Sequence, residues 1–191
     1  MDRLERAARR IEEVIAGSTV PEDPEHSRNT LQWLLELDPE ADAALQIAAL
    51  GHDIDRAVEE RKVRRADFAD YDAFKAAHAR NGAQILTELL EACGIEDAAF
   101  LREVHRLVCC HEVGGDPRSD LLVDADSLSY FDVNLPLYFA RHGWEETQRR
   151  CVWGYRRLSK RSLPVAANLN YSDLELQRLV DTSLAEVSTR P

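Results

Sequence analysis

The chain has 191 residues, of which 45% are hydrophobic and 31% charged. This composition is typical of a folded globular domain and excludes a disordered chain, which would lack the apolar residues that form a core. The 24 basic and 35 acidic side chains give a net charge of −11. Such a charge repels polyanions, so we expect neither a nucleic-acid polymer nor an anionic membrane as a partner.

A single domain over residues 1–191 is expected, because a chain of this length buries about 70% of its unfolded surface around one core. The four cysteines show no CxxC spacing and two are adjacent, which argues against disulfides and against a thiolate zinc site. The N-terminal stretch lacks the apolar run of a signal peptide, and no stretch reaches the ~18 apolar residues of a membrane span. We therefore expect a reduced, cytoplasmic protein.

Apolar residues recur at three- and four-residue spacing along most of the chain, which predicts helices and no strands. A Pro-rich turn follows the first helix, Pro39 marks the start of the third, and the charged residues 54–70 indicate a loop or short helix. The expected helices are residues 2–16, a helix within 26–40, a helix from Pro39 to His52, and residues 71–94, 96–111, 119–141, 144–161 and 171–187. The predicted fold is all-α, a compact single-domain helical bundle.

Four of the six histidines lie on the apolar faces of four different predicted helices: His26, His52, His78 and His111. A single inward histidine is most often a satisfied core residue. Four of them, together with the carboxylate of Asp53, would be costly to bury without partners, whereas metal ions would satisfy all of them. The pattern therefore predicts a buried metal site.

This ordered set, His26, then His52-Asp53, His78, His111 and a later aspartate in "VDADSLSYF", resembles the HD-domain superfamily of metal-dependent phosphohydrolases. The resemblance is to the dinuclear variant and covers about residues 20–135, leaving the helices at about 144–187 outside it. It implies that His26, His52, Asp53 and the later aspartate hold one metal. It also implies that Asp53 bridges to a second metal held by His78 and His111.

Two residues compete for the role of the later aspartate. Asp124 and Asp126 are two positions apart, about 200° around a helix, so they do not face the same site. Apolar residues align with both of them, and periodicity does not decide. The superfamily's usual A-D-x-L pattern matches Ala125-Asp126-Ser127-Leu128, which favours Asp126.

Imidazole and carboxylate ligands without thiolate suit one or two divalent transition metal ions, with iron or manganese expected before cobalt, nickel or zinc. A bound metal lowers the pKa of its water from about 15.7 to about 7, and a second ion clamps the phosphoryl oxygens. The resemblance thus implies an enzyme that cleaves a phosphate ester of a small metabolite or nucleotide, as a phosphomonoesterase, nucleotidase or phosphodiesterase. His52 and Asp53 would be catalytic through the metal.

Further candidates surround this set. Lys75, one helical turn before His78, and Arg56, which follows the His-Asp pair, are candidates to bind a substrate phosphate. Asp55 is a candidate general base or partner of a metal ligand, with a plain loop carboxylate as the alternative. Two basic clusters have two possible roles, because each could bind a ligand or pair with acidic side chains of the protein. The first consists of Arg61, Lys62, Arg64 and Arg65, which follow Glu59 and Glu60. The second is a predicted helical face formed by Arg156, Arg157, Lys160 and Arg161.

Two other functions need the same ligands. One is a di-iron oxygenase of the inositol-oxygenase type, and the other is a noncatalytic, metal-stabilised nucleotide-binding module. His105 lies about 120° around its helix from His111 and is expected to pack outside the site. His142, beside Gly143, is expected to end a helix.

Overall fold

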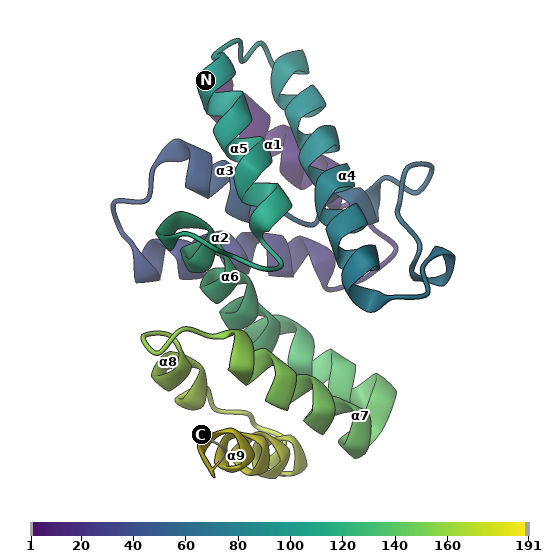
Figure 1. Cartoon of the computed structure of the whole chain (residues 1–191), viewed down its shortest axis with the longest axis vertical. Coiled ribbons are helices and arrows are strands. Elements are labelled where there is room, and N and C mark those ends of the chain that lie inside the picture. The colour runs from purple at the N-terminus through teal and green to yellow at the C-terminus, as the bar shows by residue number, and fades with distance from the viewer. Residues whose placement is uncertain (1, 190–191) are drawn as a thin grey trace.

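The computed structural model describes residues 2–189 and is all-helical over that range, as predicted. Figure 1 shows the helices, and their bounds are α1 (Arg3–Ile15), α2 (Asp23–Leu37), α3 (Ala43–Gly51), η1 (Ile54–Ala57), η2 (Arg65–Asp67), α4 (Tyr71–Ala92), α5 (Ala98–Cys110), α6 (Pro117–Ser129), η3 (Tyr130–Asn134), α7 (Leu135–Arg157), α8 (Leu163–Ala167) and α9 (Leu174–Thr189). None of these is long and apolar enough to cross a membrane.

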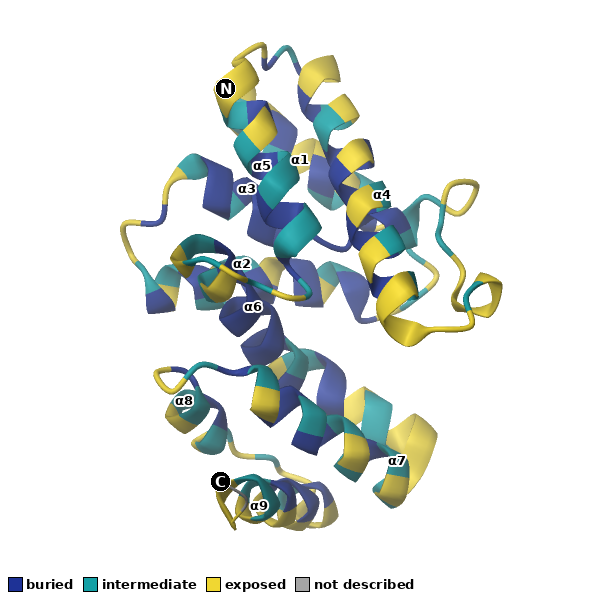
Figure 2. Cartoon of the chain, in the orientation of Figure 1, coloured by how far each residue is buried: buried dark blue, intermediate teal, exposed yellow. Residues whose placement is uncertain are grey.

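The helices form two packed groups joined by α6. Helices α1 to α5 lie together at one end of the molecule, α7 to α9 lie at the other, and α6 runs between them (Figure 1). One contiguous cluster of buried apolar side chains extends from Ala7 to Val180 and includes residues of both groups. Figure 2 shows α6 buried along its second half, where every residue from 122 to 129 is buried. Polar residues on this part of α6 are therefore held in the interior.

Aspartate N-caps set where several helices begin. The side chains of Asp42, Asp70, Asp97 and Asp116 accept backbone N–H groups at the starts of α3, α4, α5 and α6. The cap at Asp42 also corrects the prediction that the third helix starts at Pro39. Its Oδ1 accepts the N–H groups of Ala44 and Leu45, so the helix begins at Ala43.

The predicted helix 119–141 is interrupted in the structure. A π-helical turn, η3, separates α6 from α7, and α7 itself kinks at Gly143, whose φ of 70° is a conformation that glycine adopts readily. The kink agrees with the predicted break between residues 141 and 144. Pro164, expected in a connection, lies in the first turn of the short helix α8.

The predicted helix 144–161 ends early, at Arg157. The backbone N–H of Ser159 donates to Asp124 Oδ1 at 2.8 Å instead of continuing the helical ladder. The predicted helical face of Arg156, Lys160, Arg157 and Arg161 is therefore wrong. Arg161 donates to the carbonyl of Leu37 at the end of α2, while Arg157 turns toward the interior.

Candidate metal centre

The six candidate metal ligands come from five segments and are buried together. Each is at most 9% exposed, although all are polar or ionisable. His52 and His111 cap the C-termini of α3 and α5, and Asp53 follows His52 directly. The helices α2, α4 and α6 supply the remaining three, which are His26, His78 and Asp126.

Four of these residues form a first group around a common point. The Nε2 atoms of His26 and His52 are 3.3 Å apart, and Asp126 Oδ1 lies 3.2 Å and 3.6 Å from them. Asp53 Oδ2 lies 3.9 Å and 3.6 Å from the same two nitrogens. Ligand atoms bound about 2.1 Å from one ion are about 3–3.5 Å from each other. The group therefore has nearly the spacing of a coordination shell.

Asp53 also joins a second group with its other carboxylate oxygen. Oδ1 lies 2.8 Å from His78 Nε2 and 3.8 Å from His111 Nε2. The ligand atoms of His26, His52 and Asp53 lie within 4.8 Å of one another, and so do those of Asp53, His78 and His111, as a metal site requires. A carboxylate that directs one oxygen to each group has the orientation of a bridging ligand.

Hydrogen bonds on the far side of each ring leave Nε2 directed at the centre. His52 Nδ1 is 2.9 Å from the carbonyl of Ala49, and His111 Nδ1 is 2.7 Å from that of Val108. Because a carbonyl only accepts, Nδ1 carries the proton in both rings. His78 Nδ1 lies 2.6 Å from Asp55 Oδ1, also an acceptor. In the neutral form, each of these rings presents the lone pair of Nε2.

In His26, too, Nδ1 carries the proton, although its partner is a hydroxyl group. Ser129 Oγ donates its one proton to the carbonyl of His26 at 3.1 Å. The contact of 2.8 Å between Ser129 Oγ and His26 Nδ1 must then use a lone pair of the hydroxyl oxygen. His26 Nδ1 is therefore the donor, and His26 Nε2 faces the centre as an acceptor. This donor set fits a divalent transition metal ion, for which fixed imidazoles of this kind are the usual ligands.

The pKa values reflect two buried carboxylates that need positive charge beside them. Although burial opposes ionisation of Asp53, Arg56 and the nearby histidines hold its pKa well below the ordinary range. Burial lowers the pKa of His52 and of His78, but the carboxylates outweigh it and raise these values to about 9 and about 10. For His111, burial dominates and lowers the pKa.

Asp126 and Asp124 face opposite sides of α6, and only Asp126 faces the imidazoles. Asp124 instead accepts hydrogen bonds from Ser159 N at 2.8 Å, Ser159 Oγ at 2.6 Å and Ser162 Oγ at 2.8 Å. Its carboxylate holds the turn after α7. The structure thus places Asp126 at the centre and gives Asp124 a structural role.

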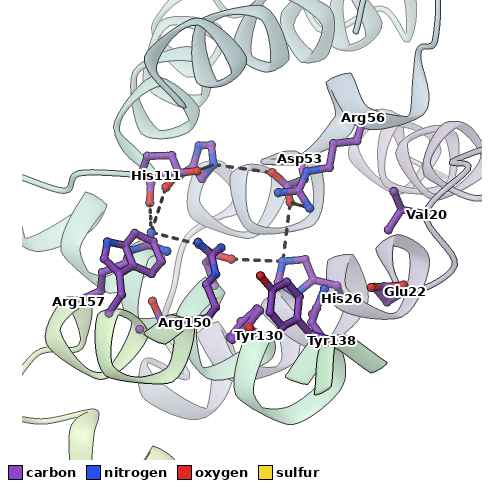
Figure 3. A pocket seen from close by; sticks show the side chains of 16 residues that line it. Val20, Glu22, His26, Asp53, Arg56, His111, Tyr130, Tyr138, Arg150 and Arg157 are labelled. Carbon is purple, nitrogen blue, oxygen red and sulfur yellow. Dashed lines mark hydrogen bonds and ion pairs between the residues drawn. The ribbon is translucent and has the colours of Figure 1, made fainter. Parts of the chain in front are cut away.

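A pocket of about 170 Å³ opens beside the centre and is lined by His26, Asp53, His111 and Asp126, among others. Three arginines also line it: Arg56, Arg150 and Arg157 (Figure 3). Tyr130, Tyr138 and Trp153 supply aromatic surface. The pocket therefore combines candidate metal ligands with cationic and aromatic groups.

The proposed substrate-binding residues differ in their positions. Arg56 lines the pocket, with Nη1 2.9 Å from Asp53 Oδ2. Lys75 is buried outside the lining, with Nζ 5.0 Å from the ring centroid of Trp153 and 3.7 Å from Glu112 Oε2. Asp55 is fully buried behind His78 and does not line the pocket. The position of Asp55 thus fits the expected partner of a metal ligand, and its carboxylate does not face the pocket as a base acting on a substrate would.

Sequence reasoning named Arg157 only as part of a basic face and missed Arg150 and Trp153, which also line the pocket from α7. Arg150, Trp153 and Arg157 are spaced by three and four residues, so they share one helical face. Arg157 Nη2 lies 3.3 Å from Asp126 Oδ2 and 3.6 Å from Glu112 Oε2. The spacing is visible in the sequence, but the helix lies outside the region of the HD-domain resemblance.

The other basic and histidine candidates lie elsewhere. Arg61 pairs with Glu88 at 2.5 Å, whereas Lys62 and Arg64 pair with Glu59, which supports the paired-surface interpretation of this cluster. His105 Nδ1 contacts Thr87 Oγ1 at 3.3 Å, and the ring of His142 packs on Tyr138, with centroids 4.3 Å apart. The four cysteines are free, as expected.

The family model described as "Domain of unknown function (DUF4202)" matches residues 2–180. The chain belongs to this family. The match to DUF4202 includes the six candidate ligands and the α7 arginines. No curated protein and no solved structure matches the chain.

Proposed function

We propose that this DUF4202 protein is a metal-dependent phosphohydrolase of the HD type that cleaves a phosphate ester of a small metabolite or nucleotide. The observation that carries the proposal is the position of Asp53. Its two oxygens face two separate histidine groups, and the pocket beside it is lined by arginines. A dinuclear centre next to a cationic pocket is well suited to phosphate-ester hydrolysis.

The residues divide into three tasks. Four imidazoles and the carboxylates of Asp53 and Asp126 hold the ions, which when bound supply a hydroxide nucleophile near neutral pH and relieve charge on the leaving oxygen. Ser129, Asp55 and two backbone carbonyls fix the rings. Arg56 and Arg157 lie at the pocket wall, where they attract a phosphate group and orient it toward the centre.

The pocket favours hydrolysis of a phosphate ester over oxidation of a neutral polyol. Arginine side chains are suited to planar, bidentate recognition of phosphate or carboxylate, and an uncharged substrate would not require them. The same arginines would also serve a nucleotide-binding module without turnover, so the decisive measurement is product formation.

The test is phosphate release from phosphomonoesters, nucleotides and phosphodiesters by protein stripped of metal and reloaded with Fe(II), Mn, Co, Ni or Zn. We expect turnover with iron or manganese, and its loss by at least about 100-fold in Asp53→Asn, because the bridging charge is removed. His105→Gln, which alters a histidine outside the centre, is the control and should retain activity. Folded protein without turnover under any metal would contradict the proposal, and metal-dependent oxygen consumption would support the oxygenase instead.

A further inference from the structure

Arg150 differs from the other arginines of the pocket in its partners. Arg56 contacts Asp53 and Asp23, with Nη1 2.9 Å and 3.5 Å from their carboxylates. Arg157 contacts Asp126 and Glu112. Within residues 2–189, no carboxylate lies within salt-bridge distance of Arg150. It is therefore a pocket cation that the protein does not neutralise.

The surroundings of Arg150 fix its plane and leave its edge available. The guanidinium carbon lies 4.4 Å from the ring centroid of Trp153 and 5.3 Å from that of Tyr130. Its Nη1 donates to Tyr71 Oη at 3.3 Å, and the hydroxyl of Tyr130 is a second neighbouring acceptor. A guanidinium has five N–H donors in a planar fork that matches a carboxylate or phosphate. Most of these donors are without a protein acceptor.

Contacts through Trp153 and Arg157 connect Arg150 to the candidate metal centre. The guanidinium carbon of Arg157 lies 4.8 Å from the centroid of the same indole, and Arg157 Nη2 reaches Asp126. In Figure 3, Arg150 and Arg157 enter from α7 while Arg56 enters from the opposite side. A ligand held at the centre thus has Arg150 beside it within the same pocket.

We propose that Arg150 binds a second anionic group of the substrate. The substrate class is then a small phosphate ester that carries another phosphate or a carboxylate near the ester that is cleaved. The reacting phosphate lies at the metal centre, and the second anion accepts hydrogen bonds from the free edge of Arg150. This inference rests on the proposed function for the identity of the reacting group, but its test is a binding measurement.

Three nonhydrolysable ligands separate the possibilities in calorimetric titrations of the metal-loaded protein. Methylphosphonate has one anionic group, phosphonoacetate adds a carboxylate, and methylenebisphosphonate adds a second phosphonate. We expect at least one of the two larger ligands to bind about 10- to 100-fold more tightly than methylphosphonate, as a hydrogen bond between charged groups would provide. The ligand whose gain depends more strongly on Arg150 identifies the second anion.

Two substitutions assign the gain to Arg150. In Arg150→Met, which keeps an unbranched side chain over Trp153, the preference for the larger ligands should fall about 10- to 100-fold relative to the unsubstituted protein, because the charge-assisted hydrogen bonds are lost. Arg150→Lys keeps the charge without the fork and should show an intermediate preference. Arg149→Met removes an exposed neighbour paired with Glu146 and should leave the preference unchanged. Chelation of metal by the larger ligands contributes to the preference in every variant, so the part that Arg150 supplies is the difference in preference between variants.

Equal affinities in the unsubstituted protein, absence of binding, or an unchanged preference in Arg150→Met would each overturn the subsite. Melting temperatures report whether each variant is folded. If Arg150→Met does not fold, Arg150→Lys tests whether the ligand preference depends on the guanidinium group. If the protein hydrolyses esters but shows no preference for the larger ligands, the Arg150 subsite is contradicted and the phosphohydrolase proposal stands. A preference that depends on Arg150, without turnover of any ester, would support the subsite while contradicting the hydrolase.

Discussion

His78 Nδ1 lies 2.6 Å from Asp55 Oδ1, and the opposite nitrogen of the ring lies 2.8 Å from Asp53 Oδ1. The imidazole is therefore held between a fully buried carboxylate and the candidate bridging ligand. Asn81 Nδ2 is 3.4 Å from the second oxygen of Asp55, which orients the carboxylate in turn. A histidine fixed in this way has a defined ring plane and a more basic Nε2.

Asp55→Asn is predicted to weaken metal binding about 10- to 100-fold, because removing the charge makes His78 a poorer ligand. Titration of metal-free protein with Mn or Fe(II) measures the affinity. Asp67→Asn, at an exposed position of η2, is the control and should bind normally. An Asp55→Asn variant with normal metal affinity would show that the contact to His78 is structural only.

Substitutions of the two neighbouring aspartates of α6 should have opposite consequences. Asp126→Asn is predicted to remove a charged ligand from the first group and lower metal occupancy at least about 10-fold, with the fold retained. Elemental analysis after gel filtration gives the occupancy. Full occupancy in folded Asp126→Asn would remove this residue from the ligand set.

Asp124→Asn is predicted to leave metal occupancy unchanged and to lower the free energy of unfolding by about 1–3 kcal/mol. It removes a charged acceptor that is 5% exposed and binds Ser159 and Ser162. Urea denaturation of metal-loaded protein measures the loss. A stability equal to that of the unsubstituted protein would contradict the structural role assigned to Asp124.

Metal affinity should rise with pH. The pKa values of His52 and His78, about 9 and about 10 in the metal-free centre, mean that both rings are protonated at neutral pH. A metal must displace these protons, so affinity should increase by up to about 100-fold per pH unit until the pH approaches the lower pKa. Competition with a chelator of known affinity at several pH values measures the slope. A slope of zero would show that the rings are neutral before metal binds.

The stability of the metal-free protein, unlike its metal affinity, should fall as the pH rises. Because both pKa values are raised above that of a free imidazole, about 6.5, protonation of these rings stabilises the folded state. This contribution is complete below about pH 6.5 and is lost as the pH rises through the folded-state pKa values. Denaturation of chelator-treated protein across this range measures it. The control is metal-saturated protein, which should lack this decline because its rings carry no exchangeable Nε2 proton.

Gly82→Ala is predicted to lower the free energy of unfolding by about 1–3 kcal/mol. An added Cβ would lie 3.1 Å from the backbone oxygen of His52, so α4 would move away from the end of α3. Helix propensity alone predicts a gain of about 1 kcal/mol. Ala76→Gly, at an exposed position of the same helix, measures the size of that propensity effect. A more stable Gly82→Ala variant would show that the two helices are not in close contact here.

Local sequence patterns were enough to predict the helical fold and four inward-facing histidines. Helical periodicity is a property of neighbouring residues, so it places His26, His52, His78 and His111 on apolar faces without knowledge of packing. The order of these residues pointed to a metal centre bridged by Asp53. The exact start of α3 was missed because the cap at Asp42 competes with the signal of Pro39.

Other features depended on how distant helices meet. The A-D-x-L pattern favoured Asp126 over Asp124, but the physical basis of that choice lies in the turn after α7, where Ser159 and Ser162 donate to Asp124 while Asp126 faces the imidazoles. The orientation of His78 by Asp55 depends on α4 crossing the segment after α3. Neither relationship has a local signal, because the partners are about 20 to 40 residues apart and their contact follows from packing.

The sequence by itself determined that this protein is helical, with buried imidazoles and carboxylates suited to a metal, because periodicity and residue chemistry are encoded locally. Only the tertiary structure showed that Asp124 binds the turn after α7 while Asp126 faces the centre, and that Arg150 and Trp153 line the pocket beside Arg157. The physical reason is that the π-helical turn between α6 and α7 and the kink at Gly143 within α7 set the direction of the part of α7 that carries these residues. Such changes of direction depend on packing across the whole core.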